Sequence, residues 1–323
     1  MSKPFIRARE TCASLTSQRI LITGSSGLLG SALATALLAE GTDVVCLDVR
    51  AHGEARGDVR DPARLHEVVD SVDGVIHLAA VSRVIWGEKD PELCWATNVG
   101  GLDSVLQAAR RSARTPWLIF ASSREVYGQP ERLPASEDCP LRPMNVYARS
   151  KVAGEMLVEE ARRSGVRACT VRLSNVFGTT SDHADRVVPA FARAAAFGRE
   201  LRVEGLDHTF DFTHIDDVTR GLGALTALLA AGDPPPAPIQ FVTGRPTTLG
   251  ELARIAVRCG QSTCTIRPSA PRHFDVAHFV GDWSRARSLL GWQPQVELEQ
   301  GVARLVRAFR ESHQTADLQE VAQ

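Results

Sequence analysis

Short hydrophobic runs rich in β-branched residues alternate with longer amphipathic stretches through the first half of the chain. The runs are RILITG, DVVCLDV, GVIHLAA, PWLIFASS and RACTVRLSNVFG, and the amphipathic stretches cover residues 28–40, 62–71, 91–111 and 146–163. The runs predict strands and the stretches predict helices. Strands that alternate with helices form a parallel sheet covered on both faces, and such a sheet binds ligands at the carboxyl ends of its strands.

This alternation ends after Gly178, where shorter and more mixed elements begin. We therefore predict a doubly wound α/β domain followed by a smaller C-terminal lobe over the ligand edge of its sheet. The predicted parts are a flexible tail at 1–17, the α/β domain at 18–180 with 208–244 returning to it, the lobe at 181–207 and 245–312, and a C-terminal tail at 313–323.

The glycine-rich segment TGSSGLLG, residues 23–30, joins the first predicted strand to the first helix. Three glycines at this spacing leave room for a tight turn, for close approach of a pyrophosphate and for helix–strand contact. Asp48 ends the second strand, where a carboxylate binds the adenosine ribose and repels a 2′-phosphate. The pattern predicts a Rossmann domain that binds NAD, although Arg50 could instead pair with the 2′-phosphate of NADP.

Composition and charge narrow the classes of partner. The chain has 37 basic and 38 acidic residues, so its net charge gives no footprint for nucleic acid or an anionic membrane. Its seven scattered cysteines lack a CxxC spacing, which favours reduced thiols and a cytoplasmic protein. We find no HExxH or comparable spacing, and we expect no catalytic metal. His77 and Tyr127 are expected to be core residues.

Five motifs together resemble the extended short-chain dehydrogenases/reductases, and within them the NAD-dependent nucleotide-sugar epimerases and dehydratases. They are TGSSGLLG, HLAA at 77–80, ASSREVYG at 121–128, YARSK at 147–151 and RLSNVFG at 172–178. The resemblance covers about residues 19–310. It implies an enzyme in which Tyr147 and Lys151 act as a catalytic pair, and a homodimer packed through the two long helices.

Tyr147 and Lys151 are four residues apart, so on a helix they lie on one face. Removing a hydride from a sugar carbinol also requires a base for its O–H proton. A free tyrosine has a pKa near ~10, and we expect the Lys151 ammonium and the positive nicotinamide ring to lower it. The resemblance assigns Ser123 to the hydrogen bond that orients the reacting oxygen. Ser122 is its competitor, because strand side chains alternate in direction.

The expected cofactor contacts combine the glycine loop, the ends of the second and third strands, the GDVRD segment, the middle helix with Asn98, and the helix with Tyr147 and Lys151. They are Gly24, Ser26, Gly27, Leu28, Leu29, Asp48, Asp58, Val59, Leu78, Ala79, Ala80, Asn98, Tyr147 and Lys151.

The residues after Ser123 bear on the reaction. Related dehydratases carry Asp-Glu there, whereas this chain has Arg124 and Glu125, and an arginine cannot act as the acid because its pKa lies above ~12. We therefore predict a 4-epimerase that works through a transient 4-keto sugar. Two alternatives stay open: a dehydratase or uronate decarboxylase that uses Glu125, and a non-catalytic NAD(P)-binding sensor or scaffold.

The second lobe is expected to bind the nucleotide diphosphate of the sugar substrate. The resemblance implies an arginine before Asp-Phe in TFDFTHIDDV, but the chain has Phe210 there. Arg83 or Arg186 could substitute for that arginine, since a guanidinium suits phosphate. The full set of expected substrate contacts is Arg83, Ser123, Arg124, Asn175, Arg186, Arg272 and Asp275.

Overall fold

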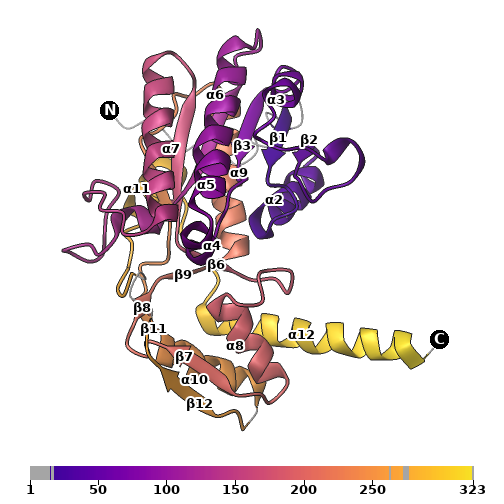
Figure 1. The fold of residues 1–323 in the computed structure, drawn as a ribbon, viewed down its shortest axis with the longest axis vertical. Helices are drawn as coiled ribbons and strands as arrows, with labels where there is room; N and C mark the ends of the chain where they lie inside the picture. The colour runs from indigo at the N-terminus through magenta and orange to yellow at the C-terminus, as the bar shows by residue number, and fades with distance from the viewer. Residues whose placement is uncertain (1–14, 16–17, 262, 272–275, 322–323) are drawn as a thin grey trace.

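The computed structural model describes Leu15 and residues 18–261, 263–271 and 276–321, with side chains up to His313. Its centre is a six-stranded parallel sheet in the order β10-β5-β4-β3-β1-β2 (Figure 1). The strands are β1 (Arg19–Thr23), β2 (Asp43–Leu47), β3 (Gly74–His77), β4 (Trp117–Ser123), β5 (Ala168–Leu173) and β10 (Ile239–Phe241). The predicted fold class, a doubly wound α/β sheet, is confirmed.

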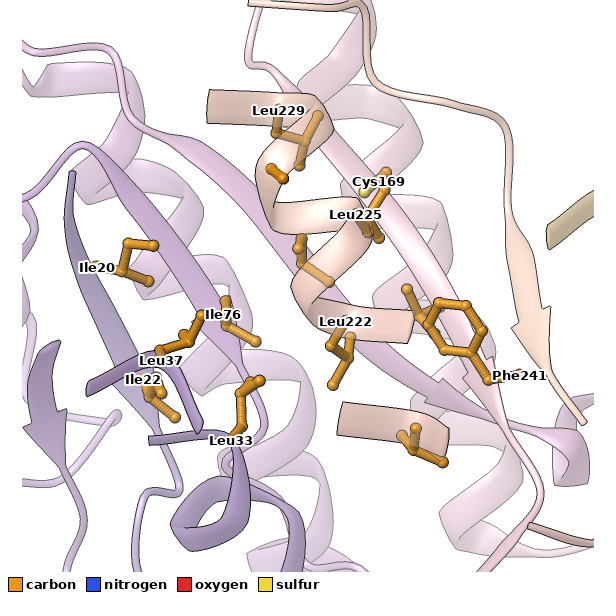
Figure 2. Packing of buried hydrophobic residues seen from close by; sticks show 14 of the residues in the cluster. Ile20, Ile22, Leu33, Leu37, Ile76, Cys169, Leu222, Leu225, Leu229 and Phe241 are labelled. Carbon is orange, nitrogen blue, oxygen red and sulfur yellow. The ribbon is translucent and has the colours of Figure 1, made fainter. Parts of the chain in front are cut away.

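Hydrophobic side chains on both faces of the sheet hold the helices against it. Alternation along β1 directs Ile20 and Ile22 to one face and Leu21 to the other. The first face packs against α2 (Leu28–Ala39), α9 (Ile215–Ala230) and α11 (Ser284–Leu290), and Figure 2 shows this cluster. The second face packs against α3 (Pro62–Val69), α6 (Gly101–Arg111) and α7 (Val146–Arg163). Each fully buried leucine or isoleucine contributes roughly 1.5–3 kcal/mol.

The helix predicted at 91–111 is broken into three pieces. Helix α5 (Pro91–Trp95) runs into a π-helical turn (Ala96–Gly100) before α6 begins, and α4 (Val84–Lys89) precedes it. Periodicity cannot show such a turn, because one extra residue hardly disturbs the pattern. Turns of this kind often lie at functional sites, and this one carries the buried Asn98.

The C-terminal lobe packs three helices over small two-stranded sheets. The helices are α8 (Val187–Ala196), α10 (Leu249–Gly260) and α12 (Leu298–Val321). Strand β7 (Leu201–Glu204) pairs with β12 (Ile266–Ser269), and β8 (Thr209–Phe210) pairs with β11 (Thr247–Thr248). At the junction, β6 (Asn175–Phe177) pairs with β9 (Phe212–His214). In Figure 1 the lobe lies beyond one end of the sheet, so the ligand edge faces it.

The structure describes parts of both expected tails. Leu15 lies in the predicted N-terminal tail, but it is buried against the first core cluster. Helix α12 continues to Val321 through most of the predicted C-terminal tail, and the His313 ring packs edge-on against Phe197. Leu15 and His313 thus each pack against apolar or aromatic side chains. No helix in the described part of the chain is long and apolar enough to cross a membrane.

Candidate active site

A cavity of about 470 Å³ lies between the carboxyl edge of the sheet and the lobe. Ser123 at the end of β4, Tyr147 in α7 and Asn175 in β6 line its sheet side. Arg186 before α8 and Phe210 in β8 line its lobe side. The chain topology thus brings together five of the positions that matter most to the predicted chemistry.

The glycine loop forms a cradle that side chains would fill. Gly24 has φ +73°, and a Cβ there would lie 2.6 Å from the backbone N of Ala79. A Cβ on Gly30 would collide with the carbonyl oxygen of Gly24. Gly27 precedes α2, and no described side chain caps that helix end. The first N–H groups of α2 and their dipole are therefore available to an anionic pyrophosphate, as the predicted dinucleotide requires.

Asp48 lies directly after β2, with its carboxylate held by backbone donors. Oδ2 accepts from the N–H of Ser26 at 3.0 Å, and Oδ1 accepts from the N–H of Arg50 at 2.8 Å. The carboxylate is therefore fixed beside the glycine loop, with lone pairs left for ribose hydroxyls. The exposed Arg50 side chain stays close, with Nε 3.5 Å from Asp48 Oδ1.

The remaining expected cofactor residues lie on both sides of this loop. The N–H of Ala79 donates to Thr23 Oγ1 at 3.3 Å, which holds the segment Leu78–Ala80 against Gly24. Asp58 pairs with Arg60 at 2.6 Å, and this hydrogen bond lowers the pKa of Asp58. Val59 is buried against Gly101 of α6. The partly buried Leu28 and Leu29 pack at the start of α2 on the first core cluster.

Asn98 connects the loop after β3 to α7. Its Oδ1 accepts from the N–H of Val81 at 2.7 Å, and its Nδ2 donates to Val81 O at 3.1 Å and to Ser150 Oγ at 2.9 Å. This fully used amide holds the wall of the site close to the helix that carries Tyr147.

Tyr147, Ser123 and Lys151 form one buried cluster. Ser123 and Tyr147 both line the cavity, and Ser123 Oγ accepts from the N–H of Glu125 at 3.2 Å. Lys151 Nζ donates to Ala121 O at 2.8 Å and lies 5.9 Å from the centroid of the Tyr147 ring. The helix thus places the two side chains on one face of α7, as their spacing predicts.

Burial dominates the ionisation of this pair. It raises the pKa of Tyr147 to about 12, although the nearby Ser123 hydroxyl and the Arg186 charge act in the opposite direction. Burial also lowers the pKa of Lys151 to about 8. In the protein alone, desolvation of the phenolate outweighs the Arg186 charge, and the combined effect of Lys151 and a bound nicotinamide ring stays a prediction.

Ser122 points away from the cavity. Its Oγ donates to Glu155 Oε1 at 2.6 Å, and Glu155 also binds the Arg172 guanidinium with Oε2 2.7 Å from Nη2. Arg172 Nη1 donates to Tyr127 Oη at 3.0 Å, which places Tyr127 in a buried polar network as expected for a core residue. Sequence reasoning missed this network, although an arginine inside a buried strand was a signal for it.

Glu125 has both carboxylate oxygens occupied. Oε1 lies 2.8 Å from Arg124 Nη2, and Oε2 accepts from Asn145 Nδ2 at 3.1 Å. Asn145 also caps α7, since its Oδ1 accepts from the N–H of Ala148 at 2.8 Å. Glu125 therefore links the end of β4 to the start of α7.

The expected substrate arginines on the cavity wall are already paired. Arg83 binds Asp185 with both terminal nitrogens, at 2.8 Å for Nη2 and Oδ2. Arg186 Nε lies 3.5 Å from the buried Asp182 Oδ1. Sequence reasoning missed both aspartates, although their place in the DHADR segment offered a signal. The Nδ2 of Asn175 is buried without a hydrogen-bond partner among the described residues.

Two further expectations have separate outcomes. Arg272 and Asp275 lie outside the described residues. His77 is buried in β3, its Nδ1 is 2.9 Å from Thr23 Oγ1, and burial lowers its pKa to about 3, which fits a core histidine. Within the described residues no group of three or more His, Cys, Asp or Glu side chains could hold a metal ion.

Comparison with known proteins shows the family to which this chain belongs. A sequence profile described as "NAD dependent epimerase/dehydratase family" matches residues 20–239. A UDP-glucose 4-epimerase of Mycolicibacterium smegmatis is 33% identical over 319 residues, which cover 92% of this chain and 100% of that enzyme. UDP-glucuronic acid decarboxylase 1 of Xenopus tropicalis is 30% identical, with 91% of this chain and 72% of that protein covered.

A solved structure agrees with these sequence matches. The UDP-glucose 4-epimerase of Thermotoga maritima with UDP-glucose superimposes with a TM-score of 0.83 at 26% identity, covering 91% of this chain and 99% of that one. The glycine cradle, the fixed Asp48 and the Ser123–Tyr147–Lys151 cluster are thus found in a chain that belongs to the NAD-dependent epimerase/dehydratase family and is an enzyme of that family.

Proposed function

We propose that this enzyme interconverts the C4 epimers of a nucleotide-diphosphate sugar, with Tyr147 as the base. The observation that carries the proposal is the joint presence of Ser123 and Tyr147 on the cavity wall, with the buried Lys151 Nζ 5.9 Å from the centroid of the Tyr147 ring. For a sugar alcohol bound beside this pair, the Ser123 hydroxyl orients the reacting oxygen and the Tyr147 phenol exchanges its proton. The UDP-glucose 4-epimerases similar to the chain support the choice of reaction.

The cofactor fits the cradle that the residues form. We propose that the open end of α2 holds the pyrophosphate of NAD, that Asp48 binds the adenosine ribose and that Lys151 binds the nicotinamide ribose. The remaining proposed contacts are Gly24, Ser26, Gly27, Leu28, Leu29, Asp58, Val59, Leu78, Ala79, Ala80, Asn98 and Tyr147. NAD supplies the site with a reversible hydride acceptor and a positively charged ring.

The protein's own part is the movement of one proton. Tyr147 accepts the proton of the C4 hydroxyl as that carbon becomes a ketone, and Ser123 holds the oxygen by a hydrogen bond. Because burial raises the pKa of Tyr147 to about 12, the phenolate needs nearby positive charge. Lys151 and the oxidised cofactor provide it. After the keto sugar rotates, the same phenol returns the proton and the net redox state is unchanged.

The engagement of Glu125 favours epimerisation over dehydration or decarboxylation. Arg124 and Asn145 each bind one oxygen of Glu125, so an acid or base role of Glu125 at C5 has to compete with both contacts. Arg124 itself cannot supply the acid of a dehydratase.

The proposal is tested by incubating the purified protein with UDP-, TDP-, CDP- and GDP-sugars. The products are then identified by mass spectrometry and NMR. We expect an isomer of unchanged mass with inverted C4. Loss of water or of carbon dioxide would instead support the rival reactions. Binding of NAD without turnover of any sugar would support a sensor or scaffold.

A further inference from the structure

Phe210 stands where the family resemblance implies an arginine, and its ring contacts another arginine. The guanidinium carbon of Arg124 lies 4.6 Å from the centroid of the Phe210 ring and 5.7 Å from that of Phe279. A guanidinium at such distances is attracted to the face of an aromatic ring. The position that lacks an arginine is therefore in contact with one from the end of β4.

Arg124 has an unused hydrogen-bond donor in a buried place. Its Nη2 is 2.8 Å from Glu125 Oε1, whereas its Nη1 is buried and has no hydrogen-bond partner among the described residues. A buried charged donor without a partner is costly, so a group from outside the chain is the natural acceptor. Arg124 and Phe210 both line the cavity.

The other arginines on the cavity wall are either already paired with carboxylates or mostly exposed. Arg83 and Arg186 would have to leave the carboxylates of Asp185 and Asp182. Arg202 is mostly exposed, and its Nε donates to Ser269 Oγ at 3.2 Å. Arg124 alone among these four combines burial, an aromatic platform and an unpartnered Nη1.

We propose that Arg124, supported by the ring of Phe210, binds an oxyanion of the substrate and replaces the arginine that is missing at 210. The inference rests on the proposed function, since it requires a nucleotide-sugar in the cavity. Two parts of such a substrate offer the same chemistry: the diphosphate and the carboxylate of a uronic acid sugar. A planar guanidinium with free N–H donors suits either one.

The experiment measures ligand binding by calorimetry with the full chain saturated with NAD. The variants are Arg124→Met and Arg124→Lys, and the probes are UDP, UDP-glucose and UDP-glucuronate. If Arg124 binds the diphosphate, Arg124→Met weakens all three probes by about 10- to 100-fold. If it binds the sugar carboxylate, only UDP-glucuronate is weakened. Arg124→Lys retains the charge but lacks the planar pair of N–H donors. Its dissociation constants should therefore lie between those of the wild type and those of Arg124→Met.

Dissociation constants within twofold of wild type for all three probes would overturn the inference. Absence of binding by the wild-type protein to any nucleotide-sugar, with NAD still bound, would instead refute the proposed function, so the two failures can be told apart. The control is Arg114→Met, at an exposed arginine that pairs with Asp73 before β3, at the amino end of the sheet. It should leave binding unchanged.

Loss of Arg124 also leaves Glu125 without its ion-pair partner, so a folding defect has to be separated from a binding defect. The double variant Arg124→Met/Phe210→Arg returns a guanidinium to the same wall from β8. We expect it to recover at least part of the lost affinity at an NAD affinity equal to wild type. A folded double variant that binds no better than Arg124→Met would contradict a shared oxyanion for the two positions.

Discussion

Tyr147 and Lys151 show how burial sets the starting point of the chemistry. Both side chains are buried, and desolvation shifts each pKa towards the neutral form, to about 12 for the phenol and about 8 for the ammonium. The phenol is thus a weak acid until positive charge comes close to it. This makes proton transfer at Tyr147 dependent on the bound cofactor under the proposed mechanism.

Tyr147→Phe removes the proposed base and little volume. We expect kcat to fall by roughly 10²–10⁴-fold, with the affinity for NAD retained, because general base catalysis typically contributes that much. Steady-state kinetics and NAD titration check both values. Tyr127→Phe is the matched control, since its hydroxyl donates to Gln240 at 3.1 Å in the buried network. It should cost stability and leave turnover near wild type; an active Tyr147→Phe would contradict the mechanism.

The pH dependence of turnover should report Lys151. Its proposed role requires the ammonium form, and with a pKa of about 8 that form is lost as the pH rises through 8. We expect kcat to decline on the alkaline side with an apparent pKa near 8. A flat profile between pH 7 and about pH 9.5 would exclude the proposed role.

The titration of Lys151 does not destabilise the folded protein in the pH range where kcat is expected to decline. Its folded pKa lies below its unfolded value of 10.5, so between about pH 8 and 10.5 the unfolded chain binds more protons. The contribution of Lys151 to stability therefore rises across that window, and circular dichroism should show a folded protein where activity has fallen.

At the scale of elements, the glycines at the junction of β1 with α2 have two different roles. Some are required by the fold, and one leaves space for a ligand. Gly24 and Gly30 have no room for a Cβ because backbone atoms fill the space. At Gly27 the nearest atom to a Cβ is the Gly24 carbonyl oxygen at 3.1 Å, a tight but smaller conflict. The space in front of Gly27 is therefore the part of the loop that a ligand would use.

Substitution by alanine should distinguish these glycines. We expect Gly30→Ala to destabilise the fold by more than about 2 kcal/mol, since the backbone must move. Gly27→Ala should cost little stability but weaken NAD at least about tenfold by filling the approach to the helix end. Thermal unfolding and NAD titration measure the two effects. The control is Gly223→Ala in α9, where no described atom lies within 4 Å of the added Cβ; NAD affinity should be unchanged.

Across the whole molecule, the sheet and the lobe meet at the cavity, while helices α5 and α7 expose apolar side chains to solvent. Helices α5 and α7 contact each other, and they expose Leu93, Trp95 and Met156, the last at 68% of its surface. Large apolar side chains exposed on two neighbouring helices are typical of a protein contact. We therefore propose a homodimer formed through these helices.

Met156→Glu tests the dimer. A buried carboxylate at a twofold interface would face its own copy, so we expect the variant to be monomeric at concentrations where the wild type is a dimer. Light scattering after size exclusion measures the mass. Met144→Glu, at an exposed methionine before α7, is the control and should leave the mass unchanged. A wild-type protein of 35.0 kDa at all concentrations would refute the dimer.

The sequence alone determined the features that depend on neighbours along the chain. The parallel sheet follows from alternating runs, the cradle from glycines whose spacing spans one turn, and the Tyr147–Lys151 face from helical period. These elements form as predicted because each depends on local geometry.

Only the tertiary structure decided which groups are buried and which charges meet. The hydrogen bonds of Asn98, the raised pKa of Tyr147 and the pairing of Arg83 with Asp185 all arise from contacts between distant segments. The same holds for Arg124 on the ring of Phe210. Motif comparison identifies the missing arginine at 210, but desolvation and contact depend on three-dimensional packing, which no local pattern encodes.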